Sequence, residues 1–229
     1  METEILYTDP QLVVCIKPAG LVSEEGGMPE QLRAQTGGEC YCVHRLDKAA
    51  GGVMVYARTA QAAAALSSAI AAGRMEKEYL AVVQGVPAEP EGSFCDLLFH
   101  DAGRNKTYVV SRPRRGVREA LLDYALIETR SREGKDLSAV WIRLHTGRSH
   151  QIRVQFASRG MPLAGDGRYG SALRSCPLAL WSWRLRFPHP LDGRDVCFSS
   201  PPPERFPWDA FGLHNIIFRE DTNTGGLLP

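Results

Sequence analysis

The length of the apolar segments constrains the fold most, because most of them are too short for helices. They are rich in valine, isoleucine, leucine and aromatic residues, which is typical of strands. The principal ones lie at residues 11–16, 52–57, 78–85, 121–130, 137–146 and 178–187. They do not alternate regularly with helices, which argues against a parallel βαβ arrangement. The pattern predicts an α+β fold, with a mixed, largely antiparallel central sheet flanked by helices.

One helical turn is expected near residues 29–35, and two longer segments carry most of the helical part of this prediction. Thr59 is a suitable N-cap for an alanine-rich helix that stops at Gly73. A second helix is expected over 149–159, with Ile152 and Phe156 one turn apart on its buried side. The last dozen residues are expected to be frayed, since they follow a proline-rich stretch and carry no apolar periodicity.

The composition excludes several classes of protein. The six cysteines fall in a 229-residue chain that is too large to need a disulfide scaffold. Cys15 and Cys197 lie in apolar runs, so we expect both to be small core residues. No cysteine or histidine pairs have zinc-ligand spacing, so no metal is implied. No apolar run approaches the roughly 18–20 residues of a membrane span, and the acidic start is not a signal peptide, so we expect a cytoplasmic protein.

The charge distribution says more than the net charge, which is only +1. Of the 27 basic residues 22 are arginines, whose planar fork suits phosphate oxygens. One stretch has six basic side chains and no acid: Arg104, Lys106, Arg112, Arg114, Arg115 and Arg118. Most charge runs are solvated loops. A local basic stripe on a nearly neutral protein is also typical of a nucleic-acid-binding face, and both interpretations stay open at this point.

Three segments carry the chemistry. The first is His44-Arg45-Leu46-Asp47, which Gly51-Gly52 and an apolar strand follow. The second is Lys77-Glu78-Tyr79, and the third runs from Leu144 to Arg153 as LHTGRSHQIR. Their order resembles that of the RluA-type pseudouridine synthases. Residues 162–170 (PLAGDGRYG) and Lys17-Pro18-Ala19-Gly20 extend this resemblance, which covers roughly residues 5–190.

The sequence also departs from the family's pattern. Lys48-Ala49-Ala50 stands where the family usually has an acidic residue and Thr-Ser, so hydroxyls that would brace the turn after Asp47 are missing. Gln155 occupies a position where histidine is common, and Ile16 one where asparagine often precedes Lys-Pro. None of these changes removes a catalytic group.

The resemblance implies a role for each matching residue. Asp47 would be the catalytic carboxylate, Tyr79 would pack against the uracil and pass a proton, and Arg148 would keep Asp47 ionised. A carboxylate has an unperturbed pKa of about 3.9, so it needs such a cation once it is buried. The residues expected to bind substrate are His44, Arg45, Lys77, Gly147, Arg112, Arg114, Arg115 and Arg118. His44 is also expected to be a hydrogen-bonded structural residue, and His145 and His150 to be structural.

The implied activity is the isomerisation of uridine in structured RNA to pseudouridine, which is redox-neutral and needs no cofactor. The carboxylate would attack the sugar or the ring, or stabilise positive charge on the sugar, and the sequence does not choose among these routes. Ribosomal and transfer RNA are both open as partners. We expect residues 1–229 to form a single catalytic domain without a separate N-terminal RNA-binding domain, and to act as a monomer.

Alternatives come from other classes of protein. A glycosidase would need a second catalytic carboxylate, and no segment supplies a partner for Asp47. A zinc nucleobase deaminase would need His-x-Glu with Pro-Cys-x-x-Cys, and both are absent from the sequence. A catalytically weak RNA-binding protein that keeps the synthase fold is the remaining alternative, favoured by the altered turn after Asp47.

Overall fold

The structure is a computed structural model that describes residues 2–132 and 134–213. The chain forms two compact units. Unit 1 comprises Met1–Tyr79 and Trp181–Ser200, and unit 2 comprises Leu80–Leu180 with the residues from Pro201. The predicted fraying of the last dozen residues lies outside the described residues. The expectation of a single catalytic domain over 1–229 stays a prediction.

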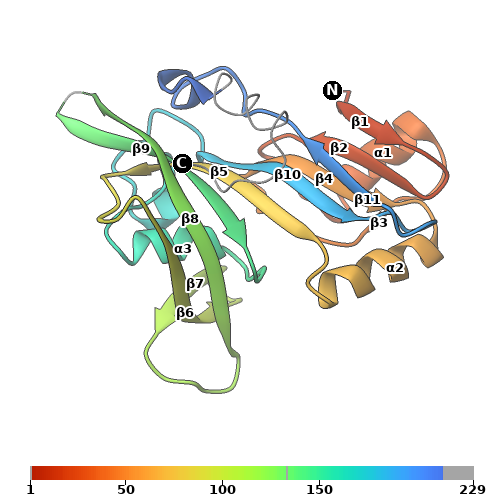
Figure 1. Ribbon diagram of the computed structural model, residues 1–229, viewed down its shortest axis with the longest axis horizontal. Coiled ribbons are helices and arrows are strands. Elements are labelled where there is room, and N and C mark those ends of the chain that lie inside the picture. The colour runs from red at the N-terminus through yellow and green to blue at the C-terminus, as the bar shows by residue number, and fades with distance from the viewer. Residues whose placement is uncertain (1, 133, 214–229) are drawn as a thin grey trace. The chain divides into compact units, whose positions relative to one another are not determined.

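Unit 1 is built on strands that pair mostly antiparallel (Figure 1). The strands are β1 (Ile5–Thr8), β2 (Leu12–Lys17), β3 (Tyr41–Cys42), β4 (Gly51–Ala57), β10 (Leu180–Pro188) and β11 (Asp195–Ser199). Their order is β1-β2-β4-β10, with β3 paired to β4 and β11 to β10. Of these pairings, β4 with β10 is parallel and the others are antiparallel. The helices are α1 (Met28–Thr36) and α2 (Ala60–Ala71).

Strand β4 is buried along its whole length, which explains its continuous apolar sequence. Val53 and Val55 belong to a core cluster that also contains Ala62 and Leu66 of α2. Because successive side chains of a strand point to opposite faces, Tyr56 lies on the other face. The predicted N-cap of α2 is confirmed, since the Thr59 hydroxyl accepts a hydrogen bond from the Ala62 amide at 3.0 Å.

Two adjacent glycines allow β4 and β10 to pair closely. Gly51 pairs with Trp181 and Gly52 with Ser182. A Cβ atom on Gly51 would lie 2.6 Å from the Trp181 ring, and one on Gly52 would lie 2.2 Å from the Ser182 carbonyl oxygen. Gly52 also has a φ of +121°, which side chains disfavour. Packing therefore requires both glycines of the motif.

Unit 2 contains an antiparallel sheet with the order β9-β8-β6-β7. The strands are β6 (Glu91–Asp101), β7 (Lys106–Val110), β8 (Val117–Arg132) and β9 (Lys135–Leu144). The helical elements are α3 (Gln151–Ala157), η1 (Gly167–Tyr169) and η2 (Trp208–Ala210). Strand β5 (Glu76–Gln84) runs along the sequence from unit 1 into unit 2. The predicted α+β fold with largely antiparallel pairing is confirmed.

Helix α3 covers one face of this sheet. Val154 packs against Leu98 of β6 and Ala120 of β8. Phe156 stacks edge-on against Phe94 and Tyr124, with ring centroids 5.1 and 5.8 Å apart. Such aromatic contacts add specific geometry to the burial of apolar area.

Three sequence predictions need correction. The helix expected over 149–159 is α3, which has only seven residues, because His150 at its start adopts a left-handed φ of 55°. The sequence indicated one helical turn near 29–35, whereas α1 has nine residues. Cys15 is buried as expected, but Cys197 is exposed, because it lies on β11, where every residue is at least partly accessible.

No helix in the described part of the chain is long and apolar enough to cross a membrane. Among the same residues, no group of three or more histidine, cysteine or acidic side chains is arranged to hold a metal ion.

The close pairing of β4 and β10 gives a first prediction. Gly52→Ala should lower the free energy of unfolding by about 3 kcal/mol or more, because backbone must move to relieve the clash. Gly73→Ala is the matched control: its φ is also positive, at +69°, but no atom lies within 4 Å of the added Cβ. It should cost only about 1–2 kcal/mol. Urea unfolding of both variants measures the difference, and equal losses would contradict the prediction.

Candidate active site

The backbone just before Asp47 is held from both sides. The Ser23 hydroxyl accepts a hydrogen bond from the Leu46 amide at 3.1 Å and donates one to the Leu46 carbonyl at 3.0 Å. The Tyr56 hydroxyl of β4 donates to the Ser23 carbonyl at 2.9 Å. These bonds are buried and link the segment before α1 to the motif. They fix the backbone of Leu46, the residue that precedes Asp47.

The backbone just after Asp47 is held by Lys17, which is fully buried at the end of β2. Its Nζ donates to the carbonyl oxygens of Pro18, Lys48 and Ala50 at 2.9, 3.3 and 2.7 Å. The Gly20 amide also donates to the Lys48 carbonyl, at 2.7 Å. Lys17 therefore braces the turn that lacks the family's hydroxyls.

The environment of Lys17 is electrostatically demanding. Burial lowers its pKa to about 8, while the nearby Asp47 carboxylate opposes that shift. The ammonium group therefore remains mostly protonated at neutral pH. Sequence reasoning noted Lys17 as part of a motif but missed this role, because nothing local indicated which carbonyls its side chain would reach.

Tyr79 lies in the same unit as Asp47 and interacts with it. It is 5% exposed and lies in β5. Burial raises its pKa, the Asp47 carboxylate raises it further, and the Ser182 hydroxyl opposes these effects. The phenol therefore keeps its proton at neutral pH, and Tyr79 and Asp47 are close enough to interact. Ser182, which also donates to the Val53 carbonyl at 3.0 Å, was not anticipated from sequence.

The remaining candidates of unit 1 differ in how they are held. His44 is buried, and its Nε2 accepts a hydrogen bond from the Val55 amide at 3.2 Å, so Nδ1 carries the proton. Burial, with a smaller contribution from Lys77, lowers the pKa of His44 to about 3. Burial also lowers the pKa of Lys77. Arg45 is exposed and pairs with Glu24 at 3.0 Å.

These contacts support the interpretation of His44 as a hydrogen-bonded structural residue. The contribution of His44, Arg45 and Lys77 to substrate binding stays a prediction. The Arg45–Glu24 pair contributes little to stability, because both side chains are more than half exposed. A ligand could therefore recruit Arg45 at small cost.

In unit 2, Gln151 organises the loop that carries Arg148. Its Oε1 accepts hydrogen bonds from the Arg148 amide at 3.0 Å and from the Thr146 hydroxyl at 2.8 Å. Its Nε2 donates to the Leu121 carbonyl of β8 at 3.1 Å. The Arg148 guanidinium donates through Nε to the Glu119 carbonyl at 2.9 Å. Gln151, which sequence reasoning did not single out, thus sets the path of this loop.

A buried ion pair joins the third motif to residues 162–170. Arg153 binds Asp166 through two hydrogen bonds of 2.7 and 2.8 Å, and its guanidinium lies 5.1 Å from the centroid of the Tyr169 ring. The Tyr169 hydroxyl accepts from the Thr107 amide at 2.8 Å and contacts His150 Nδ1 at 2.9 Å. His145 lies instead 2.6 Å from Asp123. These contacts support the structural interpretation of both histidines.

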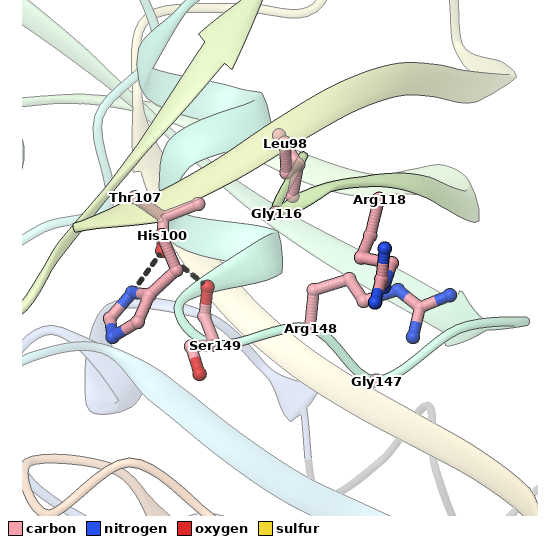
Figure 2. A pocket seen from close by; sticks show the side chains of 8 residues that line it. All are labelled: Leu98, His100, Thr107, Gly116, Arg118, Gly147, Arg148 and Ser149. Carbon is pink, nitrogen blue, oxygen red and sulfur yellow. Dashed lines mark hydrogen bonds between the residues drawn. The ribbon is translucent and has the colours of Figure 1, made fainter. Parts of the chain in front are cut away.

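A pocket of about 230 Å³ opens between this loop and the sheet of unit 2 (Figure 2). The residues that line it are Leu98, His100, Thr107, Gly116, Arg118, Gly147, Arg148 and Ser149. Three residues predicted from sequence, Arg118, Gly147 and Arg148, therefore lie together. Gly147 does not lie at a helix start, because α3 begins only at Gln151, and the neighbouring Arg148 amide already donates to Gln151.

The other arginines of the basic stretch do not line this pocket. Arg114 stacks on the Phe99 ring at 4.6 Å from its centroid. Phe99 alternates along β6 with Leu98 and His100, so Arg114 lies on the opposite face of the sheet. Arg112 and Arg115 are exposed in the loop before β8. The stretch is thus divided between two faces.

The structure brings Asp47, Tyr79, Lys77 and His44 into unit 1, and Arg148, Gly147 and Arg118 into unit 2. Within unit 1, Asp47 and Tyr79 interact electrostatically. The pairing of Asp47 with Arg148 stays a prediction.

Comparisons with known proteins place these motifs in context. A family profile described as RNA pseudouridylate synthase matches residues 11–158. The chain is 35% identical over 228 residues to the Ribosomal large subunit pseudouridine synthase D of Xanthomonas campestris pv. campestris, covering 87% of this chain and 66% of that protein. It is 31% identical over 238 residues to the protein of the same name from Pseudomonas aeruginosa, covering 91% and 71%. The chain thus spans about two thirds of these relatives' length.

The solved structure of Human RNA Pseudouridylate Synthase Domain Containing 1 aligns with a TM-score of 0.81 at 23% identity. The alignment covers 99% of this chain and 97% of that one. At this identity the likeness shows a shared fold.

The buried neutral His44 predicts a specific loss of stability in acid. Its folded pKa of about 3 lies below the unfolded value of about 6.5, so the unfolded state binds more protons in between. Stability is therefore full above the unfolded pKa and falls as the pH drops toward 3. Between pH 7 and about 4.5, wild type should lose about 2–3 kcal/mol more than His44→Gln, whose amide oxygen can still accept the Val55 N–H. Parallel losses in urea unfolding would contradict this.

Proposed function

This chain belongs to the RNA pseudouridylate synthase family, and we propose on that premise that it isomerises uridine in RNA to pseudouridine, with Asp47 as its catalytic carboxylate. The family is one of RNA-modifying isomerases, and the resemblance to RluA-type enzymes drawn from the motifs is confirmed. The observation that carries the proposal is the placement of Asp47. It lies half-buried on a turn fixed by Lys17 and Ser23, and it interacts electrostatically with Tyr79.

The reaction balances without a cofactor. The bond between uracil N1 and the sugar C1′ breaks, the ring turns, and a bond from C5 to C1′ forms. The proton on C5 leaves and N1 gains one. Asp47 would act on the sugar or the ring, or stabilise positive charge on the sugar, and all three routes need its ionised form. The Lys17 ammonium interacts electrostatically with that carboxylate.

Tyr79 and Arg148 complete the proposed catalytic group. The raised pKa of Tyr79 keeps its hydroxyl neutral, which suits packing against uracil and donating a hydrogen bond. Arg148 supplies a permanent positive charge, as the family motif implies. The residues proposed to bind substrate are His44, Arg45, Lys77, Gly147, Arg112, Arg114, Arg115 and Arg118.

The proposed partner is RNA, and large-subunit ribosomal RNA is the first substrate to test because the relatives with assigned names carry that designation. Transfer RNA is the second. We propose that the protein acts as a monomer in the cytoplasm, without a metal or cofactor.

The test of the proposed function begins with Asp47. Asp47→Asn is nearly isosteric, so the protein should fold while turnover falls by about three orders of magnitude or more. Release of tritium from ring carbon 5 of labelled large-subunit ribosomal RNA measures turnover. Asp192→Asn, which changes an exposed carboxylate of the same unit, is the matched control and should keep wild-type activity. Turnover of Asp47→Asn within about tenfold of wild type would remove Asp47 from its role. Binding without turnover by wild type would favour a non-catalytic RNA-binding protein.

Arg148 gives a separate prediction. Without its charge, a buried carboxylate tends to become protonated, and a protonated acid is a poor nucleophile. Arg148→Ala should therefore slow single-turnover pseudouridine formation and shift the acid limb of the pH–rate profile upward. Arg148→Lys keeps the charge but loses the fork, so it should recover part of the rate. An unchanged profile in Arg148→Ala would mean that Arg148 does not act on Asp47.

A further inference from the structure

We propose that the pocket of unit 2 is a subsite for one phosphodiester group of the RNA backbone, with Arg118 as its principal ligand. This inference rests on the proposed function and deepens it, because it assigns one backbone phosphate of the RNA to the pocket that Arg118, Gly147 and Arg148 line. It depends on three features: the composition of the pocket walls, the hydrogen bonds that hold them, and the positive charge of two guanidinium groups.

The pocket walls follow from strand register. On β6, Leu98 pairs with Arg118 of β8, and His100 pairs with Thr107 of β7. Directly paired residues share a face, so these four side chains lie on the side of the sheet that α3 covers. Leu98 packs there against Val154, which provides an apolar floor. The polar groups lie around it and can recognise a charged ligand.

Thr107 holds two walls of the pocket together (Figure 2). Its hydroxyl donates to the Ser149 carbonyl at 2.7 Å, so it can only accept at His100 Nδ1, 3.0 Å away. The Thr107 amide donates to the Tyr169 hydroxyl at 2.8 Å. These bonds fix the His100 ring and tie the loop of Gly147 to β7. The site is therefore formed before a ligand arrives, which lowers the entropy cost of binding.

Arg118 and Arg148 present two positive charges to the same pocket (Figure 2). Arg118 donates to the Val117 carbonyl at 3.3 Å, and Arg148 to the Glu119 carbonyl at 2.9 Å. Both partners are neutral carbonyl oxygens, so neither of these bonds neutralises a guanidinium charge. Each bond engages one nitrogen of its guanidinium, which leaves further N–H donors for a ligand. A tetrahedral anion between them would relieve the repulsion and accept charge-assisted hydrogen bonds.

The surroundings favour a polymer phosphate over a free ion. The pocket adjoins the loop before β8, in which Arg112 and Arg115 are exposed. A free phosphate would fill the pocket and leave these arginines without a role. An RNA strand would place one phosphate in the pocket and neighbouring phosphates along the loop, so that several contacts act on one ligand.

The first measurement is the salt dependence of polyuridylate binding, followed by fluorescence anisotropy. Each phosphate contact to a single strand contributes a slope of about 0.7 in log affinity against log salt. Arg118→Gln should therefore lower the slope by about 0.7. Arg130→Gln is the matched control, because Arg130 is an exposed arginine about 40 Å further along β8. Its slope should stay at the wild-type value, and equal slopes in all three proteins would overturn the proposal.

The second measurement identifies the ligand atom. A set of pentauridylates is prepared, each with a methylphosphonate at a different linkage. The methylphosphonate removes the negative charge of that one phosphate. At one linkage the change should weaken binding to wild type and to Arg130→Gln, but not to Arg118→Gln. Equal weakening in all three proteins at every linkage would refute the RNA contact. If inorganic phosphate binds in an Arg118-dependent manner while no linkage couples to Arg118, the pocket takes a free anion and the proposal fails.

These readouts use binding alone, so they separate the two proposals. Tritium release is measured on the same preparations. If the methylphosphonate effect at one linkage depends on Arg118 but wild type releases no tritium, the subsite stands and the catalytic proposal fails. Tritium release from wild type, with no linkage whose effect depends on Arg118, would leave the catalytic proposal standing and overturn the subsite.

Discussion

A buried ammonium group sets the geometry around Asp47, the proposed catalytic residue. Lys17 donates hydrogen bonds to three carbonyl oxygens, one of Pro18 just after β2 and two in the turn after Asp47. Burying a charge costs free energy unless hydrogen bonds compensate for it, and here three acceptors do so. The charge also attracts the Asp47 carboxylate. One side chain thereby fixes the loop and places a positive charge near the Asp47 carboxylate.

The strand that follows Asp47 depends on the same compactness. Gly51 and Gly52 let β4 approach β10 so closely that a methyl group would clash with Trp181 or Ser182. That approach places Ser182 where it affects the pKa of Tyr79. The glycines of the first motif therefore act on a residue of the second, through backbone packing rather than through chemistry of their own.

Unit 2 relies on neutral polar side chains to position its charged ones. Gln151 sets the loop that bears Arg148, and Thr107 ties that loop to β7. Thr107 is buried, and Gln151 is 3% exposed, so their bonds are shielded from water. Arg118 and Arg148 line one pocket, and the loop that bears Arg148 is held in place by these bonds. Preorganised charge of this kind suits the recognition of phosphate.

The sequence by itself determined the class of fold, the start of α2 at Thr59 and the identity of the motif residues. These depend on apolar periodicity, on capping and on fixed short spacings, all of which act over a few neighbouring residues. The sequence failed where distant parts of the chain compete with such local rules. Helix α3 starts late because His150 turns left-handed and Gln151 bonds backward to Arg148. Cys197 is exposed because it lies on β11, which pairs with β10 outside the main strand order of the sheet.

Only the tertiary structure decided which charges act together. A run of arginines looks uniform in sequence, but Arg114, in the loop before β8, lies over Phe99 on one face of the sheet, whereas Arg118 of β8 lines the pocket on the other. Likewise, Lys17 reaches Lys48 and Ala50 across more than thirty residues. Contacts of this range depend on how the strands pair, and that pairing is set by the burial of the whole core rather than by any local pattern.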